Sequence, residues 1–332
     1  MTHATAEGTA RLAGRHPEFA RAGFYREACG LKVSSLGIGT YLGAPTAAAD
    51  RAYTDALIAA GEGGINFFDT AINYRNQHSE MCVGVALQAL HRTEIVVCTK
   101  AGFLTPGAVP GFLEKDDVVG GMHSMAPRFL AHQIERSRSN LGVDTIDVFY
   151  LHNPETELAY LSGPAFEERL RRAFGALEQL VTEGKISWYG AATWDGFRVK
   201  DQLSLPRLAQ IARETGGAHH HFRFIQLPFN LSMVEAFSGG HDSVLETAAR
   251  LGITVVASAT LLQTQVLERI PEALAGLTGP ASPAQQAIQF TRSTPGITVA
   301  LVGMGKRVHV EQNLGVAAVP PLTRKQVLRL YP

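Results

Sequence analysis

The chain has 332 residues, with 30 Lys or Arg and 30 Asp or Glu, so its formal net charge at pH 7 is zero. This length is compatible with one large domain, because α/β barrels of about 250 residues or more are common. The balanced charge gives no field that would attract nucleic acid or an anionic membrane. No apolar run reaches the ~18 residues of a membrane-spanning helix, so we expect a small-molecule partner, no nucleic acid and no membrane.

The amino-terminal segment and the cysteines indicate where the protein works. Residues 1–22 lack the apolar core of a signal peptide. Cys29, Cys82 and Cys98 form no CxxC pair and are odd in number, which favours a reducing compartment. We expect a cytoplasmic protein, in which residues 1–22 form a disordered arm and residues 23–332 form one barrel domain.

Short apolar runs alternate with amphipathic stretches along the chain, a pattern typical of parallel strands joined by helices. Residues 24–35 precede the first run and predict a β-hairpin at the amino-terminal end of the barrel. The fold class that we predict is therefore α/β, a (β/α)8 TIM barrel with an N-terminal β-hairpin at the barrel bottom, with a doubly wound sheet as the alternative. The expected strands are residues 35–39, 65–68, 94–99, 146–151, 186–190, 222–227, 253–258 and 297–302. The helical patterns include residues 49–62, 79–91, 127–142, 170–185 and 243–252.

Two long loops follow predicted strands, at residues 101–125 and 153–166. Long loops in a compact domain are often functional, and the carboxyl ends of barrel strands are where active sites lie. Their apolar side chains predict either a substrate pocket or contacts that fasten the loops to the barrel. These side chains are Phe103, Leu104, Phe112, Met122, Met125, Tyr160 and Phe166.

Four side chains suited to acid–base chemistry lie at or just beyond the ends of three consecutive strands: Asp69, Tyr74, Lys100 and His152. A phenol with a pKa near 10 exchanges protons poorly at neutral pH unless its pKa is lowered. A neighbouring Lys favours the phenolate, an Asp keeps that Lys charged, and a His can donate to a substrate oxygen. The group predicts general acid–base catalysis at a carbonyl or alcohol carbon.

The segment DTAINYRNQHSEMCVG at 69–84 resembles the signature of the aldo-keto reductase family, in which Asp-Thr-Ala and a Tyr precede Ser-Glu and Gly. VVCTKAGF at 96–103 is similar to the family's Lys strand, and DVFYLHNPE at 147–155 to its His strand. Later segments resemble the cofactor-side motifs. They are KISWYGAAT (185–193), FIQLPFNL (224–231) and LVGMGKRVHVEQNL (301–314).

The resemblance implies an NADP(H)-dependent oxidoreductase that acts on a small carbonyl or alcohol substrate without a metal. It implies a catalytic tetrad of Asp69, Tyr74, Lys100 and His152, with Tyr74 as the general acid. The cofactor contacts that it implies are Gly39, Thr40, Tyr41, Asp69, Thr193, Gln226, Ser258, Leu261, Gly303, Met304, Gly305, Lys306, Gln312 and Asn313. Lys306 and Arg307 would add positive charge for a 2′-phosphate, where a loop and a helix N-terminus suit anions.

The chain departs from the family pattern at two points. Ala192-Thr193 replaces the Ser-Asn that commonly holds the cofactor's carboxamide, and residues 257–261 contain no Tyr to stack on the nicotinamide. Losing a stacked ring costs about 0.5–1.5 kcal/mol, unless another aromatic such as Trp194 replaces it.

Two further functions remain open from the sequence. One is a barrel that senses NADP(H) and regulates a partner protein without catalysis. The other is a lyase in which Lys100 forms a Schiff base, which Asp69 disfavours because it keeps Lys100 protonated. A metal site at residues 219–221, three consecutive His, is not expected, since no carboxylate or further His lies at ligand spacing.

Overall fold

The computed structural model describes residues 3–200, 202–238, 242–278 and 282–331. Eight parallel strands form a closed barrel in the order β10-β3-β4-β5-β6-β7-β8-β9, which confirms the predicted (β/α)8 fold and excludes the doubly wound alternative. The strands are β3 Leu36–Gly39, β4 Phe67–Asp69, β5 Val96–Ala101, β6 Ile146–His152, β7 Ile186–Ala192, β8 Phe222–Pro228, β9 Thr254–Ser258 and β10 Val299–Gly303.

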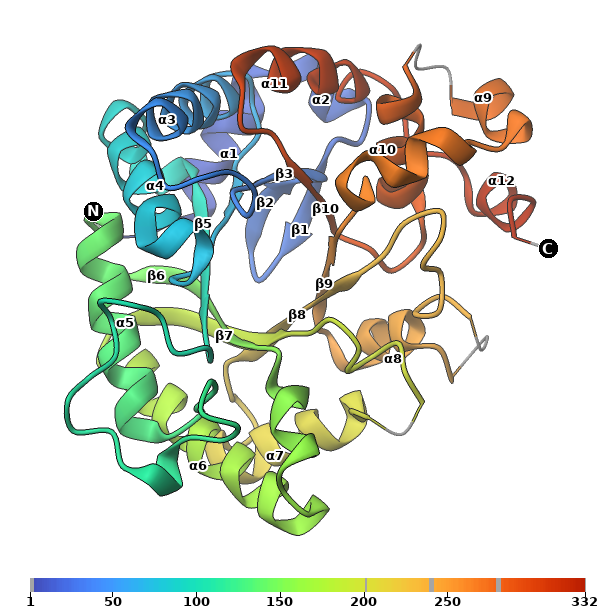
Figure 1. The fold of residues 1–332 in the computed structure, drawn as a ribbon. Helices are drawn as coiled ribbons and strands as arrows, with labels where there is room; N and C mark the ends of the chain where they lie inside the picture. Colours follow the sequence, from blue (N-terminus) through green and yellow to red (C-terminus); the bar gives the residue numbers. More distant parts are fainter. Residues whose placement is uncertain (1–2, 201, 239–241, 279–281, 332) are drawn as a thin grey trace.

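Helices surround the strands (Figure 1) and cover their outer faces. They are α3 Ala47–Glu62, α4 His78–Ala89, α5 Pro127–Leu141, α6 Gly163–Thr182, α7 Leu205–Gly216, α8 Val244–Leu251, α9 Glu272–Thr278, α10 Pro283–Ser293, α11 Arg307–Asn313 and α12 Arg324–Leu328. Among the described residues, none of these helices has the length and apolarity needed to cross a bilayer.

The predicted hairpin is present as β1 Tyr25–Ala28 and β2 Leu31–Ser34, which pair antiparallel. Cys29 and Gly30 make the tight turn, with φ of 50° and 79°, and glycine adopts this left-handed conformation at little cost. Leu31 and Val33 belong to the same buried cluster as the side chains inside the barrel. The hairpin therefore closes one end of the barrel and contributes to its core.

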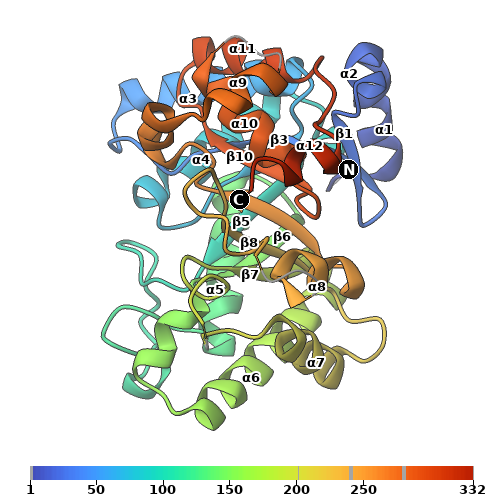
Figure 2. The same ribbon diagram turned by 90° about the vertical axis from the view of Figure 1, so that its right-hand side faces the viewer.

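The amino-terminal segment differs from the disordered arm expected from the sequence. It forms two helices, α1 Ala6–Arg15 and α2 Pro17–Arg21. Leu12 is fully buried, and Arg11 and Arg15 both form ion pairs with the buried carboxylate of Glu94. In Figure 2, α1 and α2 lie on one side of the barrel, and the loop that follows β5 lies on the opposite side.

Side-chain alternation inside the barrel sets up the functional rim. Because successive residues of a strand point to opposite faces, every second residue points inward. Phe67, Cys98, Tyr150 and Phe224 belong to the buried cluster inside the barrel. The next inward position on each of these four strands is therefore two residues further on, at the carboxyl end.

Candidate active site

Those next inward positions are Asp69 on β4, Lys100 on β5, His152 on β6 and Gln226 on β8. These polar side chains form a rim directly beyond the hydrophobic side chains that fill the barrel. The predicted Asp, Lys and His come together because neighbouring strands are in parallel register, with Asp69 opposite Cys98 and Lys100 opposite Tyr150. The carboxyl end of a (β/α)8 barrel is where such groups act.

Asp69 and Lys100 form a buried ion pair. The Nζ atom of Lys100 lies 2.6 Å from Oδ1 of Asp69 and 2.8 Å from the carbonyl oxygen of Thr70, and the Lys100 side chain is completely buried. Burial lowers the pKa of Lys100, but the negative charge of Asp69 and the hydrogen bond to it outweigh burial, so the pKa is raised above its usual value. The ammonium therefore keeps its proton at neutral pH.

Tyr74 lies beyond β4, at the start of the 3₁₀ helix η1 Tyr74–Gln77, with its side chain partly exposed. The Nζ atom of Lys100 lies 4.8 Å from the centre of the Tyr74 ring, and the rings of Tyr41 and His152 meet it edge-on at 4.9 and 5.8 Å. The pKa of Tyr74 is raised, because burial outweighs the opposing charge of Lys100. The direction is opposite to the lowering expected from the sequence. The phenol stays neutral at pH 7 and is a weaker acid than a free tyrosine, so it can donate its proton only to a strongly basic oxygen such as a developing alkoxide.

The backbone after Tyr74 is unusual. Arg75, Asn76 and Gln77 have φ of 49°, 53° and 74°, and left-handed non-glycine residues are strained and concentrate at functional sites. The buried Arg75 side chain stabilises this segment by donating to the carbonyl oxygen of Ala44 and to Oδ1 of Asp50 at 2.9 and 2.5 Å. The turn that presents Tyr74 is therefore held by side chains from the β3–α3 region.

His152 is fixed at the end of β6, and the next residue, Asn153, also has a left-handed backbone with φ of 50°. Burial, the Lys100 ammonium and His123 lower the pKa of His152 well below its usual value. The ring is therefore neutral at pH 7. Its Nδ1 atom is buried and has no hydrogen-bond partner within the described part of the chain.

Two positions expected to contact the cofactor, Thr193 just after β7 and Gln226 on β8, already have protein partners. Nε2 of Gln226 donates to Oδ2 of Asp69 at 2.8 Å, and Oγ1 of Thr193 lies 3.4 Å from the carbonyl oxygen of Gln226. Gln226 therefore orients the Asp69 carboxylate, a role that the sequence did not indicate. The Thr40 side chain is buried and donates to the carbonyl oxygen of Asp69 at 3.2 Å.

The remaining expected cofactor positions differ in exposure. Gly303, Lys306 and Gln312 are exposed, whereas the Met304 side chain is fully buried in the core. Met304 is buried as a whole residue, so it offers no exposed surface to a ligand. Gly39, Ser258, Leu261 and Gly305 are partly exposed, Tyr41 is well exposed, and Asn313 is buried.

The apolar residues of the two long loops divide into some that are buried in the core and some that are exposed. Met125 and Phe166 are buried in the main core, so these two fasten the loops to the barrel. The segment 153–166 is shorter as a loop than expected, since it contains the 3₁₀ helix η4 Pro154–Ala159 and the start of α6. Leu104 packs against the core, while Phe112, Met122 and Tyr160 are exposed.

Three buried residues near the site were not identified from the sequence. Glu155 accepts from the backbone N–H groups of residues 194–196 at 2.7–3.2 Å and so holds the loop after β7, where Trp194 is exposed. His123 and Glu157 form a buried hydrogen-bonded pair. The His123 ring also contacts the backbone carbonyl oxygen of His152. Only long-range contacts reveal these partners, since no local motif links residues this far apart.

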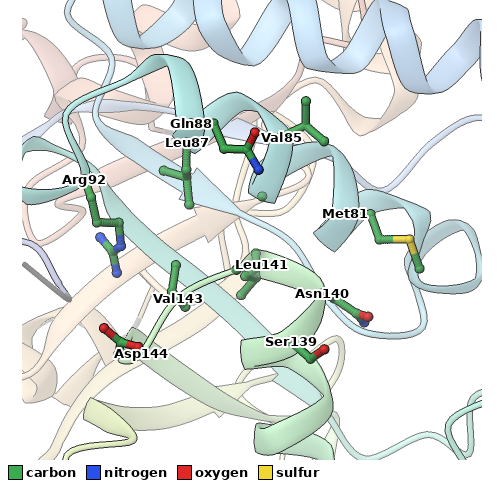
Figure 3. A pocket seen from close by; sticks show the side chains of 12 residues that line it. Met81, Val85, Leu87, Gln88, Arg92, Ser139, Asn140, Leu141, Val143 and Asp144 are labelled. Carbon is green, nitrogen blue, oxygen red and sulfur yellow. The ribbon is translucent and has the colours of Figure 1, made fainter.

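A surface pocket lies elsewhere, between α4 and α5 (Figure 3), with Met81, Val85 and Asn140 among its lining residues. Arg92 and Asp144 in its wall belong to the connections that enter β5 and β6, so this part of the wall lies at the end of the barrel opposite the polar rim. In the described ranges, no group of three or more His, Cys, Asp or Glu side chains is arranged to hold a metal ion.

A neutral phenol, an ammonium held by a carboxylate and a neutral imidazole can together move a proton to or from a substrate oxygen. The chain belongs to the aldo/keto reductase family, whose family model matches residues 35–273. Both the fold and the resemblance noted in the sequence are thereby confirmed.

Three similar proteins illustrate the range of the family. NADH-specific methylglyoxal reductase of Escherichia coli (strain K12) is 30% identical over 186 residues, or 54% of each chain, so the alignment spans about half of that relative. A putative voltage-gated potassium channel subunit beta of Schizosaccharomyces pombe is 24% identical over 86% of this chain and 85% of its own. An aldo/keto reductase from Klebsiella pneumoniae, solved in complex with NADP and acetate, matches 91% of each chain with a TM-score of 0.66 and 21% identity.

Proposed function

We propose that this protein is an NADP(H)-dependent oxidoreductase that reduces a small aldehyde or ketone, or oxidises the corresponding alcohol. The observation that carries the proposal is the Tyr74 ring beside the buried Lys100–Asp69 pair. The family membership and the relatives named as reductases support the same chemistry.

When bound, NADPH would supply the hydride that the carbonyl carbon receives in the proposed reduction. Tyr74 donates its phenolic proton to the carbonyl oxygen as negative charge develops there, and so becomes a phenolate. Lys100 stabilises that phenolate electrostatically, and Asp69 keeps Lys100 charged and in place. His152, neutral because of its lowered pKa, donates a hydrogen bond to the same oxygen and orients the substrate.

The residues at the ends of β10 and β3 suit a phosphorylated dinucleotide. Gly303 is exposed, and a Cβ atom added to it would meet nothing within 4 Å, so the backbone is open to close approach by a ligand. Lys306 offers an exposed positive charge. Gly39, Tyr41, Ser258, Leu261, Gly305, Gln312 and Asn313 complete the proposed contacts, with Thr40, Thr193 and Gln226 acting through the backbone or through Asp69.

Tyr74→Phe tests the catalytic assignment. The variant keeps the ring and removes the proton donor, so turnover of an activated aldehyde should fall at least ~100-fold, while NADPH fluorescence quenching and Tm stay at wild-type values. If Tyr74→Phe turns over normally, Tyr74 is not the general acid.

Lys306→Ala tests the preference for NADP over NAD. One relative is named NADH-specific and one structural neighbour was solved with NADP, so the two cofactors need a direct comparison. We expect wild type to bind NADPH more tightly than NADH, and Lys306→Ala to weaken NADPH alone. Equal wild-type affinities would refute the proposed contact with the 2′-phosphate.

A second candidate is a barrel that senses NADP(H) and regulates a partner. It is supported by the relative named a potassium channel subunit beta, which aligns along most of both chains. This candidate predicts NADPH binding without turnover of any aldehyde, ketone or quinone in a broad screen. A Lys100 Schiff-base lyase is disfavoured, because the raised pKa of Lys100 leaves no free amine to attack a carbonyl.

A further inference from the structure

His123, in the loop that follows β5, links that loop to the end of β6. Its ring is completely buried. The Nε2 atom lies 2.8 Å from the backbone carbonyl oxygen of His152, and Nδ1 lies 3.0 Å from Oε1 of Glu157. Glu157 is fully buried in η4, and its other oxygen lies 3.3 Å from Nη1 of Arg169. A series of contacts thus runs from the partly exposed Arg169 on α6, through the buried Glu157 and His123, to the backbone of His152.

The hydrogen-bond partners of His123 determine where protons lie on its ring. A carbonyl oxygen can only accept, so Nε2 of His123 must carry a proton and donate it to His152. One further proton must then lie between Nδ1 of His123 and the Glu157 carboxylate. The His123 ring therefore has one orientation in which both of its nitrogen atoms are satisfied.

The backbone is shaped to allow this contact. A Cβ atom added to Gly102 would lie 2.4 Å from Nε2 of His123 and 2.6 Å from the carbonyl oxygen of His152. The N–H of Ser124 donates to the carbonyl oxygen of Gly102 at 2.8 Å, which brings the two ends of the loop together. Only a residue without a side chain fits at position 102, two residues after Lys100.

The same arrangement places an aromatic ring against His152. Phe103 meets the His123 ring edge-on at 5.1 Å and the His152 ring edge-on at 5.2 Å. The His152 ring is therefore bounded by Phe103 on one side and by Tyr74 on another. Movement of His123 would release Phe103 and the His152 backbone together, because both contact the same imidazole.

We propose that His123, held by Glu157, is a positioning residue that fixes His152 in the orientation needed to bind the substrate oxygen. The proposal rests on the function proposed above, since it gives His152 a role in the reaction. His123 itself does not touch substrate. Its contribution is geometric, and displacement of a reacting group by about 1 Å can cost on the order of 100-fold in rate.

His123→Asn and His123→Gln form a matched pair of tests. Both side chains are polar amides, but only Gln is long enough to replace the Nε2–H donor. We expect kcat for an activated aldehyde to fall about 10–100-fold in His123→Asn and to stay within about fivefold of wild type in His123→Gln, with unchanged affinity for NADPH. The proposal would be overturned if kcat of His123→Asn lay within twofold of wild type, or if kcat of His123→Gln fell as far as that of His123→Asn.

A structural readout separates this proposal from the proposed function. With ¹⁵N-labelled histidine, His152 should give one sharp set of ring signals in wild type and in His123→Gln, and multiple or broadened signals in His123→Asn. In wild type the Nε2 proton of His123 should exchange slowly with solvent, and an unprotonated Nε2 would overturn the proposal without any variant. Normal turnover by Tyr74→Phe would refute the proposed reaction. The spectra would still show whether His123 fixes the orientation of His152.

Discussion

The Asp69–Lys100 pair allows a quantitative test of what holds the site together. Asp69→Asn keeps the side-chain shape but leaves the fully buried Lys100 ammonium without its carboxylate, which lies 2.6 Å away in the wild type. Removing one partner of a buried ion pair costs about 3–5 kcal/mol, because the remaining charge is uncompensated. Lys100→Met should cost a similar amount by leaving the Asp69 carboxylate with Gln226 as its side-chain donor.

The double variant Asp69→Asn/Lys100→Met carries neither charge, so its cost should be close to that of one single variant and well below the sum. Urea unfolding followed by circular dichroism measures all four proteins. A double variant whose destabilisation equals the sum of the two singles would show that the charges are not coupled, and would refute the view that Asp69 exists to hold Lys100.

Two further predictions concern the pH profile and the loop after β5. The proposed reduction needs protonated Tyr74, and the pKa of Tyr74 is raised while that of His152 is lowered. We therefore expect kcat/KM for reduction to stay flat from about pH 6 to pH 9 and to fall only above about pH 10; an inflection near pH 6.5 that disappears in His152→Gln would contradict this. Gly102→Ala should lower the free energy of unfolding, measured with urea, by about 1–3 kcal/mol, because the added Cβ would overlap buried atoms. Gly111→Ala in the same loop should leave it unchanged, because the space around that Cβ is open. Equal effects of the two substitutions would contradict the proposed packing.

The barrel was predictable because its strands are short apolar runs bounded by polar or turn residues. The expected strand at 94–99 begins two residues before β5, since residues 92–94 form a short 3₁₀ turn. The amino-terminal helices were missed for a different reason. Helix α1 buries few large side chains and is held by the ion pairs of Arg11 and Arg15 with Glu94, and local periodicity contains no information on partners about 80 positions away.

The three strand-end members of the expected tetrad were predictable because parallel strands bring their carboxyl ends to one rim. Gln226 was expected at the rim as well, but its hydrogen bond to Asp69 depends on the closure of the barrel, which sets β8 across from β4. The raised pKa of Tyr74 was not predictable, because its main cause is burial by surrounding side chains. The sequence indicates that Tyr74 lies near Lys100, but it does not indicate how far the Tyr74 hydroxyl is shielded from water.

Tyr74 and His123 differ from the rest of the site because neither lies on a barrel strand. Tyr74 is followed by three left-handed residues, each of which costs about 1–3 kcal/mol and persists only where surrounding contacts fix it. The hydrogen bonds of Arg75 to Ala44 and Asp50 provide such contacts, as Glu157 does for His123. The strands thus place the charged pair and His152, while buried polar side chains in the loops place Tyr74 and the His123 ring that contacts the backbone of His152.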